Sequence, residues 1–256
     1  MWNGKKKALT FSMDDYVPQD LRFMEILDKY GLKCTFNVNS GAIGVDAERP
    51  AFLPGAVGEP IIVNGKVCHK ETVKKPHLRV KDFEKFNGHE IAAHTLTHKI
   101  LTALDESTIV LQAEEDRLVL ERLTGRKIVG LAYPGGGKGP VYDDRVAKVL
   151  KEQTGIKYAR TNAQTFDFEL PKDLYQLDMT MHFADFDKLM ELGKKFVETD
   201  FDHPVIFSIW GHTYEMDDAY TPWEEVEEFC KFISGRDDIF YGTNEEVYLD
   251  PELNLK

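Results

Sequence analysis

Short apolar segments alternate with segments of helical spacing along almost the whole chain, and this alternation restricts the fold more than any other feature. An apolar, β-prone run at 8–11 is followed by helical spacing over 19–30 and by a second β-prone run at 33–39. Strands that alternate with helices form parallel sheets, because each helix returns the chain to the start of the next strand. The sequence therefore predicts an α/β fold with about seven parallel strands. Further strands are predicted at 89–93, 127–132, 156–160, 173–183, 205–210 and 239–241, and further helices at 80–87, 107–123, 141–153, 185–199 and 222–233.

Polar side chains at the ends of these strands favour a closed barrel over an open sheet. Asp14, His94, Arg160 and His212 each follow a different predicted strand. In a barrel the C-terminal ends of the strands share one mouth, whereas an open sheet spreads them along an edge. No glycine-rich phosphate loop follows the first strand, which argues against a nucleotide-binding open sheet. We predict a distorted (β/α) barrel that resembles a TIM barrel.

The length of 256 residues and the hydrophobic content of 42% fit one packed domain, which we predict to span residues 1–256. Residues 41–79 interrupt the alternation with glycine, proline and scattered apolar residues. We interpret this segment as an insertion that shapes a substrate cleft, because long connections of this kind are commonly functional. Within it, 61–67 is predicted to form a small hairpin with an Asn-Gly turn. The three cysteines are widely spaced and are predicted to be reduced packing residues.

The charge of the chain restricts its partners. A net charge of −12 without a long basic run argues against nucleic acid and against an anionic membrane surface. Neutral or cationic partners are favoured instead. No apolar run is long enough to cross a bilayer, and the first residues lack the apolar middle of a signal peptide, so a cytoplasmic location is predicted. The sequence does not fix an oligomeric state.

His94 and His98 are four positions apart, which is a common spacing for two metal ligands. If the backbone turns helically after Ile91, both imidazoles lie on one face and can bind one ion. Asp15 is the best candidate for a third ligand, and Asp14 beside it can take a proton from a metal-activated water. Each motif alone also occurs by accident, as helix-surface histidines or as a turn or helix cap. Their combination predicts a divalent-metal site.

Three motifs carry a resemblance to a known family. Phe-Ser-Met-Asp-Asp at 11–15 is similar to a strand that ends in Thr-Phe-Asp-Asp-Gly, with Tyr16 in place of the glycine. Residues 88–98 match a Gly-His-Glu-Ile segment followed by His-(Ser/Thr)-x-x-His, and 206–212 is an apolar strand that ends in a histidine. On these motifs the chain resembles the polysaccharide deacetylase family over nearly its whole length. The resemblance implies a metal-dependent hydrolase that removes an N-acetyl group from a sugar or oligosaccharide and releases acetate and a free amine.

The resemblance also implies roles for individual residues. Asp14 would be the catalytic base and His212 the general acid. Asp15, His94 and His98 would hold a divalent ion, with Zn²⁺ as the default and Co²⁺ or Ni²⁺ as alternatives. The residues predicted to contact the substrate are the turn Tyr133, Pro134 and Gly135, and the aromatic side chains Trp210 and Tyr214, which can stack on a sugar ring.

Two features of the family pattern are missing from this chain. The third motif of the family carries an arginine that pairs with the base, and Ala132 stands at that position. A nearby cation favours the ionised form of a carboxyl group. We predict that Arg160, at the end of the next strand, supplies this charge to Asp14. The motif that orients the general acid is also not evident, and Asp178 is its predicted substitute.

Two other functions stay open at this point. The first is a ureide amidohydrolase, similar to relatives that open cyclic ureides such as allantoin, which would use the same metal site. The second is a sugar-binding module that has lost catalysis, which the missing arginine suggests. A complete set of base, acid and metal ligands argues against the second function, because a binding module needs none of them. For a cytoplasmic enzyme, an N-acetylated soluble oligosaccharide, lipid-linked precursor or nucleotide sugar is a more plausible substrate than a wall polymer.

Overall fold

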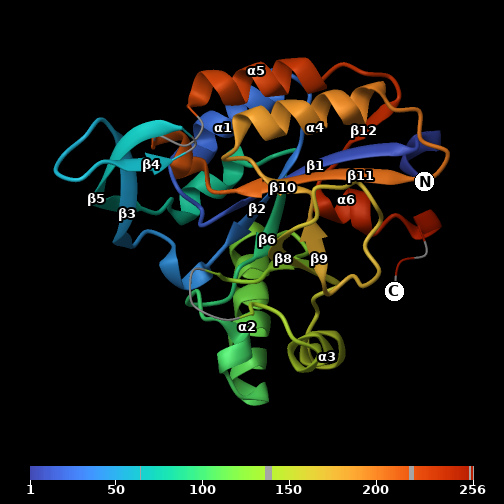
Figure 1. Ribbon diagram of the computed structural model, residues 1–256. Coiled ribbons are helices and arrows are strands. Elements are labelled where there is room, and N and C mark those ends of the chain that lie inside the picture. The colour runs from blue at the N-terminus through green and yellow to red at the C-terminus, as the bar shows by residue number, and fades with distance from the viewer. Residues whose placement is uncertain (64, 136–139, 219–221, 254, 256) are drawn as a thin grey trace.

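The computed structural model describes residues 1–63, 65–135, 140–218, 222–253 and 255 (Figure 1). Its largest sheet has the strand order β10-β11-β1-β2-β6-β7-β8-β9, and all neighbours along this path are parallel. Only Thr180 separates β9 from β10, so the two ends of the path lie together. The result is a nearly closed barrel of eight parallel strands, which confirms the predicted distorted (β/α) barrel. These strands are β1 (Lys7–Asp14), β2 (Cys34–Val38), β6 (Glu90–Ala93), β7 (Gly130–Ala132), β8 (Tyr158–Gln164), β9 (Leu177–Met179), β10 (Met181–His182) and β11 (Val205–Gly211).

Most of the remaining elements lie close to their predicted positions, but the short helix at 244–248 was not predicted. One more strand, β12 (Ile239–Tyr241), pairs in parallel with β1. The segment predicted as a short helix at 80–87 is a 3-10 helix, η3 (Val80–Lys85). In the described ranges, no helix is both long and apolar enough to cross a membrane. The α-helices are α1 (Gln19–Lys29), α2 (Glu106–Thr124), α3 (Asp144–Gln153), α4 (Phe186–Glu198), α5 (Trp223–Ile233) and α6 (Asn244–Tyr248).

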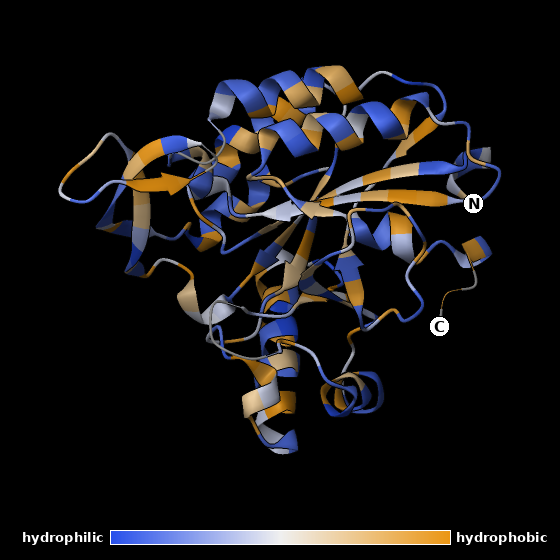
Figure 2. Cartoon of the chain, in the orientation of Figure 1, coloured by the Kyte–Doolittle hydropathy of each residue, from blue (hydrophilic) through white to orange (hydrophobic). Residues whose placement is uncertain are grey.

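The apolar strands are buried because helices cover the barrel from outside. Helices α1, α4 and α5 lie on one side of the barrel, and α2 and α3 lie on the opposite side (Figure 1). All residues of β1 are buried, as expected for a parallel strand covered on both faces. Phe11 of β1 contacts Phe23 of α1 and Phe229 of α5 edge to face, with ring centroids 5.7 and 6.3 Å away. Figure 2 shows the corresponding alternation of apolar and polar residues along these helices.

The segment 41–79 contains a separate antiparallel sheet, which we call the insertion sheet. It consists of β3 (Asp46–Pro54), β4 (Ile61–Val63) and β5 (Lys66–Pro76) in the order β3-β5-β4. The predicted hairpin corresponds to the pairing of β4 with β5, although Asn64 of its turn lies outside the described residues. Strand β3 was not predicted, because proline and charged residues conceal its alternation. The insertion sheet projects from the barrel beside the C-terminal ends of the strands (Figure 1).

Candidate active site

The C-terminal ends of the barrel strands surround one cavity of about 240 Å³. Two unpredicted residues also line it: Lys75 from the insertion sheet and Asn162 from β8. Pro134 is not among the lining residues, and Gly136 and Gly137 of the glycine-rich turn lie outside the described part of the chain. Apart from Asp178, the cavity brings together all the other predicted site residues: Asp14, Asp15, His94, His98, Tyr133, Gly135, Arg160, Trp210, His212 and Tyr214.

A tight non-helical turn brings His94 and His98 together, so the helical geometry considered for this pair is wrong. Residues 94–98 follow β6 as a loop, and Thr95 and His98 have positive φ values of 63° and 56°. Such a conformation is uncommon for residues other than glycine and needs support from its surroundings. Asn39 gives part of this support, since its side-chain amide donates to the carbonyl oxygens of His94 and Thr95. The two imidazole centroids are 4.8 Å apart.

The environment of His94 prepares its Nε2 atom to act as a ligand. Its Nδ1 lies 2.8 Å from the carbonyl oxygen of Ala132 and donates to it, which leaves the lone pair on Nε2. Burial lowers the pKa of His94 to about 4, although Asp14 opposes this shift, so the imidazole is neutral at pH 7. The backbone N–H of His94 donates to the buried Asp116 of α2 at 2.9 Å. Both the ring and the backbone of this residue are therefore fixed.

Asp15 completes a group of side chains that fits a divalent metal ion. Its Oδ1 lies 3.9 Å from His94 Nε2 and 3.8 Å from His98 Nε2, and the three candidate ligand atoms all lie within 4.8 Å of one another. Asp15 Oδ1 and His94 Nε2 are buried and have no hydrogen-bond partner among the described residues. Buried polar atoms without partners are costly. A divalent ion satisfies both of them, and two imidazoles with one carboxylate are a common ligand set for such an ion.

Replacing Asp116 with asparagine should destabilise the protein and weaken metal binding. Its two carboxylate oxygens accept the backbone N–H groups of Ser40, at 2.7 Å, and His94, at 2.9 Å. Asparagine would turn an amide NH₂ towards one of these donors, at a cost of about 1–3 kcal/mol in the free energy of unfolding. Zinc affinity should fall roughly 10- to 100-fold, as is usual when the support of a ligand is lost.

Urea unfolding and zinc titration of the Asp116→Asn protein test this prediction. Glu115→Gln is a matched control, because this exposed neighbour on α2 loses a carboxylate without touching the turn. Unchanged zinc affinity in Asp116→Asn would show that the His94 turn does not depend on α2.

Asp14 lies next to Arg160 at the base of the cavity. Asp14 is 3% exposed and Arg160 is 1% exposed. Nη2 of Arg160 donates a hydrogen bond to Oδ1 of Asp14. Burial opposes the ionised form of Asp14, but the Arg160 guanidinium, assisted by His94 and His212, outweighs it and holds the pKa below its ordinary value. Ala132 of β7 is paired in register with Arg160 of β8. The guanidinium therefore originates one strand away from the position where the family motif has its arginine.

His212 faces the same cavity from the end of β11. Its Nε2 lies 3.9 Å from Asp14 Oδ2 and 3.9 Å from Asp15 Oδ2. Its Nδ1 lies 3.4 Å from Glu215 Oε1, and Glu215 is in turn 3.1 Å from His182 Nε2. Burial opposes protonation of His212, but Glu215 and the two aspartates outweigh it and raise the pKa to about 9.

The carboxylate beside His212 is thus Glu215 and not Asp178. Asp178 instead accepts a hydrogen bond from Thr161 Oγ1. Glu215 follows His212 by three residues in the 3-10 helix η5 (Thr213–Asp217). This spacing places the two side chains on one side of the turn. A search for a carboxylate three or four positions after the histidine could have identified it.

A comparison with known protein families identifies one match. The family model described as "Polysaccharide deacetylase" matches residues 3–159. The chain belongs to the polysaccharide deacetylase family. The matched region contains Asp14, Asp15 and both candidate histidine ligands, but it ends before Arg160 and His212. A comparison with curated proteins finds no match.

Solved structures of the polysaccharide deacetylase family resemble the chain in fold at low sequence identity. A putative polysaccharide deacetylase from Mycobacterium smegmatis is 14% identical, with a TM-score of 0.63, over 99% of this chain and 93% of that chain. A CE4 family pseudoenzyme from Bacillus anthracis is 15% identical, with a TM-score of 0.50, over 96% and 66% of the two chains. The chain spans 61% of the length of a Streptococcus pyogenes deacetylase, PplD, with 65% of this chain covered, 18% identity and a TM-score of 0.48. Because one of these structures is a pseudoenzyme, family membership alone does not establish activity.

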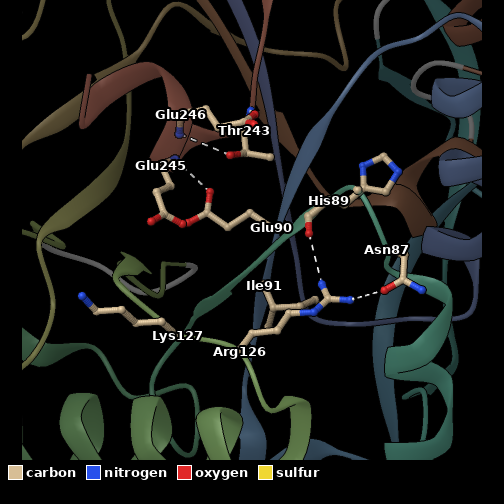
Figure 3. Close-up of a pocket in the computed structure, with 10 residues that line it drawn as sticks. Asn87, His89, Glu90, Ile91, Arg126, Lys127, Thr243, Glu245 and Glu246 are labelled. Atoms are coloured by element: carbon tan, nitrogen blue, oxygen red, sulfur yellow. Dashed lines mark hydrogen bonds between the residues drawn. The ribbon is translucent and has the colours of Figure 1, made fainter. Parts of the chain in front are cut away.

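A second cavity, of about 390 Å³, lies at the opposite end of the strands, around the start of β6 (Figure 3). It is larger than the first, but two of its charged residues, Glu90 and Arg126, are held in structural contacts. Glu90 accepts hydrogen bonds from Thr35, Tyr158 and the backbone N–H of Glu245. Arg126 donates to backbone carbonyls and to Asn87. We therefore assign the chemistry to the cavity that holds the candidate metal ligands.

Glu90→Gln should make the free energy of unfolding less sensitive to pH. Burial raises the pKa of Glu90 to about 7, above its ordinary value of 4.5. Its contribution to stability is full below the ordinary pKa and is lost as pH rises through the folded pKa, because only the unfolded chain ionises freely. Glutamine imitates the protonated acid and titrates in neither state. Between about pH 5.5 and 8.5, the free energy of unfolding of the parent should fall by about 2 kcal/mol more than that of the variant.

Urea unfolding at both pH values measures this difference. Glu84→Gln is the control, because Glu84 is exposed and its variant should follow the parent. Parallel pH profiles for the parent and Glu90→Gln would contradict the assigned role of Glu90.

Proposed function

We propose that this chain is a metal-dependent hydrolase that removes an N-acetyl group from an amino sugar or short oligosaccharide. The observation that carries the proposal is a base and an acid that face one cavity beside the metal ligands. Asp14 is held ionised by Arg160, and His212 is held protonated by Glu215. Their Oδ2 and Nε2 atoms are 3.9 Å apart. Environments that push the pKa values of two groups apart are typical of acid–base catalysis.

The side chains divide the reaction between them. When bound by Asp15, His94 and His98, a divalent ion supplies Lewis-acid chemistry, which polarises a carbonyl and acidifies water. Asp14 takes a proton from the attacking water as the new C–O bond forms at the acyl carbon. His212 gives its proton to the amide nitrogen as the C–N bond breaks. The products are acetate and a free amine, and Glu215 orients His212 for the transfer.

The size and walls of the cavity support a small substrate. Its volume of about 240 Å³ lies below the range of about 300–1,000 Å³ typical of ligand sites, so it accommodates one sugar residue better than several. Trp210 is held edge-on against His182, with ring centroids 4.5 Å apart, and the Arg160 guanidinium lies 5.0 Å from its ring. This fixed indole and the ring of Tyr214 provide apolar surfaces against which a sugar ring can pack.

Metal analysis and acetate release test the proposal together. The purified protein should contain close to one equivalent of Zn²⁺, or of Co²⁺ or Ni²⁺ when these are supplied. The loaded protein should release acetate from N-acetylglucosamine or its short oligomers, and Asp14→Asn should bind the metal without releasing acetate. Hydrolysis of allantoin alone would favour the ureide amidohydrolase. Sugar binding without metal or hydrolysis would favour the inactive binding module.

A further inference from the structure

Lys75 places a positive charge inside the candidate active site, and it belongs to none of the sequence motifs that predicted the site. It belongs to β5, and its Nζ donates to Asp15 Oδ2 at 2.6 Å. The same ammonium lies 5.2 Å from the ring centroid of Tyr214, and its side chain is 16% exposed. The insertion sheet therefore reaches directly to a candidate metal ligand.

A second contact holds the insertion sheet in this position. Arg49 of β3 makes a bidentate pair with Asp218, with N–O distances of 2.7 and 2.8 Å. It also donates to the backbone carbonyl of Tyr214 at 3.2 Å, and its guanidinium lies 4.2 Å from the Tyr214 ring. Both charged side chains of the pair are largely buried. A buried bidentate pair has a specific geometry, so Lys75 is delivered to the cavity by a fixed support.

Asp15 has two oxygens with different surroundings. Oδ1 faces His94 and His98 and has no partner among the described residues, whereas Oδ2 accepts from Lys75. A divalent ion bound through Oδ1 would share this single carboxylate with the ammonium. The positive charges of the ion and of the ammonium would then lie close together and would repel each other. The flexible side chain of Lys75 can relieve this repulsion by turning its ammonium towards the open cavity.

The charges around the cavity then favour an anion. The carboxylates of Asp14 and Asp15 balance the cations of Arg160 and Lys75, and a divalent ion held by Asp15, His94 and His98 would add positive charge. Glu215 offsets only part of this excess. The net charge of −12 on the whole chain acts weakly here, because charges beyond about 8 Å are screened at physiological salt.

We propose that Lys75 binds an anionic substituent of the substrate. The inference rests on the proposed function and adds a substrate class to it: an N-acylated amino sugar that carries a phosphate or a carboxylate. Because Lys75 and the candidate metal ligands line one small cavity, the anion must bind close to the acyl group. It therefore belongs on a carbon next to the one that bears the acylated nitrogen.

Equilibrium binding to the zinc-loaded protein tests this inference without requiring turnover. The probes are N-acetylglucosamine, its 1-phosphate, and N-acetylmuramic acid, whose carboxylate is attached through oxygen 3. At least one anionic probe should bind roughly tenfold or more tightly than the neutral sugar, as expected for a charge-assisted hydrogen bond. The comparison of the two anions distinguishes phosphate from carboxylate as the favoured group.

Three variants separate Lys75 from other sources of anion affinity. Lys75→Met should remove most of the preference and Lys75→Arg should keep it. Lys74→Met should also keep it, because this exposed neighbour on β5 carries the same charge away from the cavity. Lys75→Met should in addition bind zinc more tightly, since the ammonium no longer competes for Asp15.

The outcomes separate this inference from the proposed function. A preference that persists in Lys75→Met belongs to the metal ion and overturns the role of Lys75, as does equal or absent binding of all three probes. A Lys75-dependent preference in a protein that releases acetate neither from these probes nor from short N-acetylglucosamine oligomers supports the anion site and contradicts the deacetylase function.

Discussion

Replacing His94 with alanine should abolish stoichiometric metal binding and the hydrolytic activity that depends on it. His94 is the most constrained candidate ligand: its Nδ1 is engaged by Ala132, and its Nε2 is buried without a partner. Alanine removes this prepared lone pair from the group of candidate ligands. Removal of a supporting residue alone costs about 10- to 100-fold in metal affinity. Loss of the ligand itself should exceed that range.

Elemental analysis after dialysis, followed by zinc titration, measures this loss. His203→Ala is the matched control, since this exposed histidine pairs with Asp202 and Glu169 away from the cavity. Its variant should keep the metal content of the parent. Unchanged metal content in His94→Ala would mean that the ion binds elsewhere. His182, His212 and Glu215 would then be the next candidates, because their ligand atoms also lie within 4.8 Å of one another.

The barrel could be predicted from the sequence because most of its strands are short, buried segments that contain apolar residues and are separated by amphipathic helices. The limits of β9 and β10 could not be predicted, because only Thr180 separates the two strands. The backbone N–H of Thr180 donates to the side chain of Ser208. The insertion sheet was also only partly predicted. Its strands are largely exposed, so polar and charged residues such as those of β3 give no strong alternation.

The candidate site could be predicted where a residue stands at a strand end, and not where a turn or a distant element supplies it. Arg160 was placed beside Asp14 because consecutive parallel strands bring their ends together, and the pairing of Ala132 with Arg160 explains why one can replace the other. His94 and His98 were paired from their spacing, but the left-handed conformation of Thr95 cannot be read from a threonine. Lys75 depends on how the insertion sheet docks, which no local pattern encodes.

Arg160→Met should have the largest combined effect on activity and stability. Arg160 holds the pKa of the buried Asp14 below its ordinary value, and without it burial raises that pKa. The acidic limb of kcat/KM should therefore move to higher pH, and turnover at neutral pH should fall. A depressed carboxyl pKa adds stability that is present above the unfolded pKa. Removing one partner of a buried pair costs about 3–5 kcal/mol in the free energy of unfolding.

The pH profile and urea unfolding of a small set of variants can separate these two effects. Arg160→Met with Asp14→Asn should recover part of the stability, since no uncompensated carboxylate remains, but it should stay inactive because the base is gone. Arg117→Met is the control for loss of an arginine ion pair, because Arg117 pairs with Glu114 and Glu121 on α2, away from the cavity. If Arg160→Met kept both turnover and the acidic limb, the charge that ionises Asp14 would have to come from the metal site, and Arg160 would serve only to link β8 to β1 across the barrel.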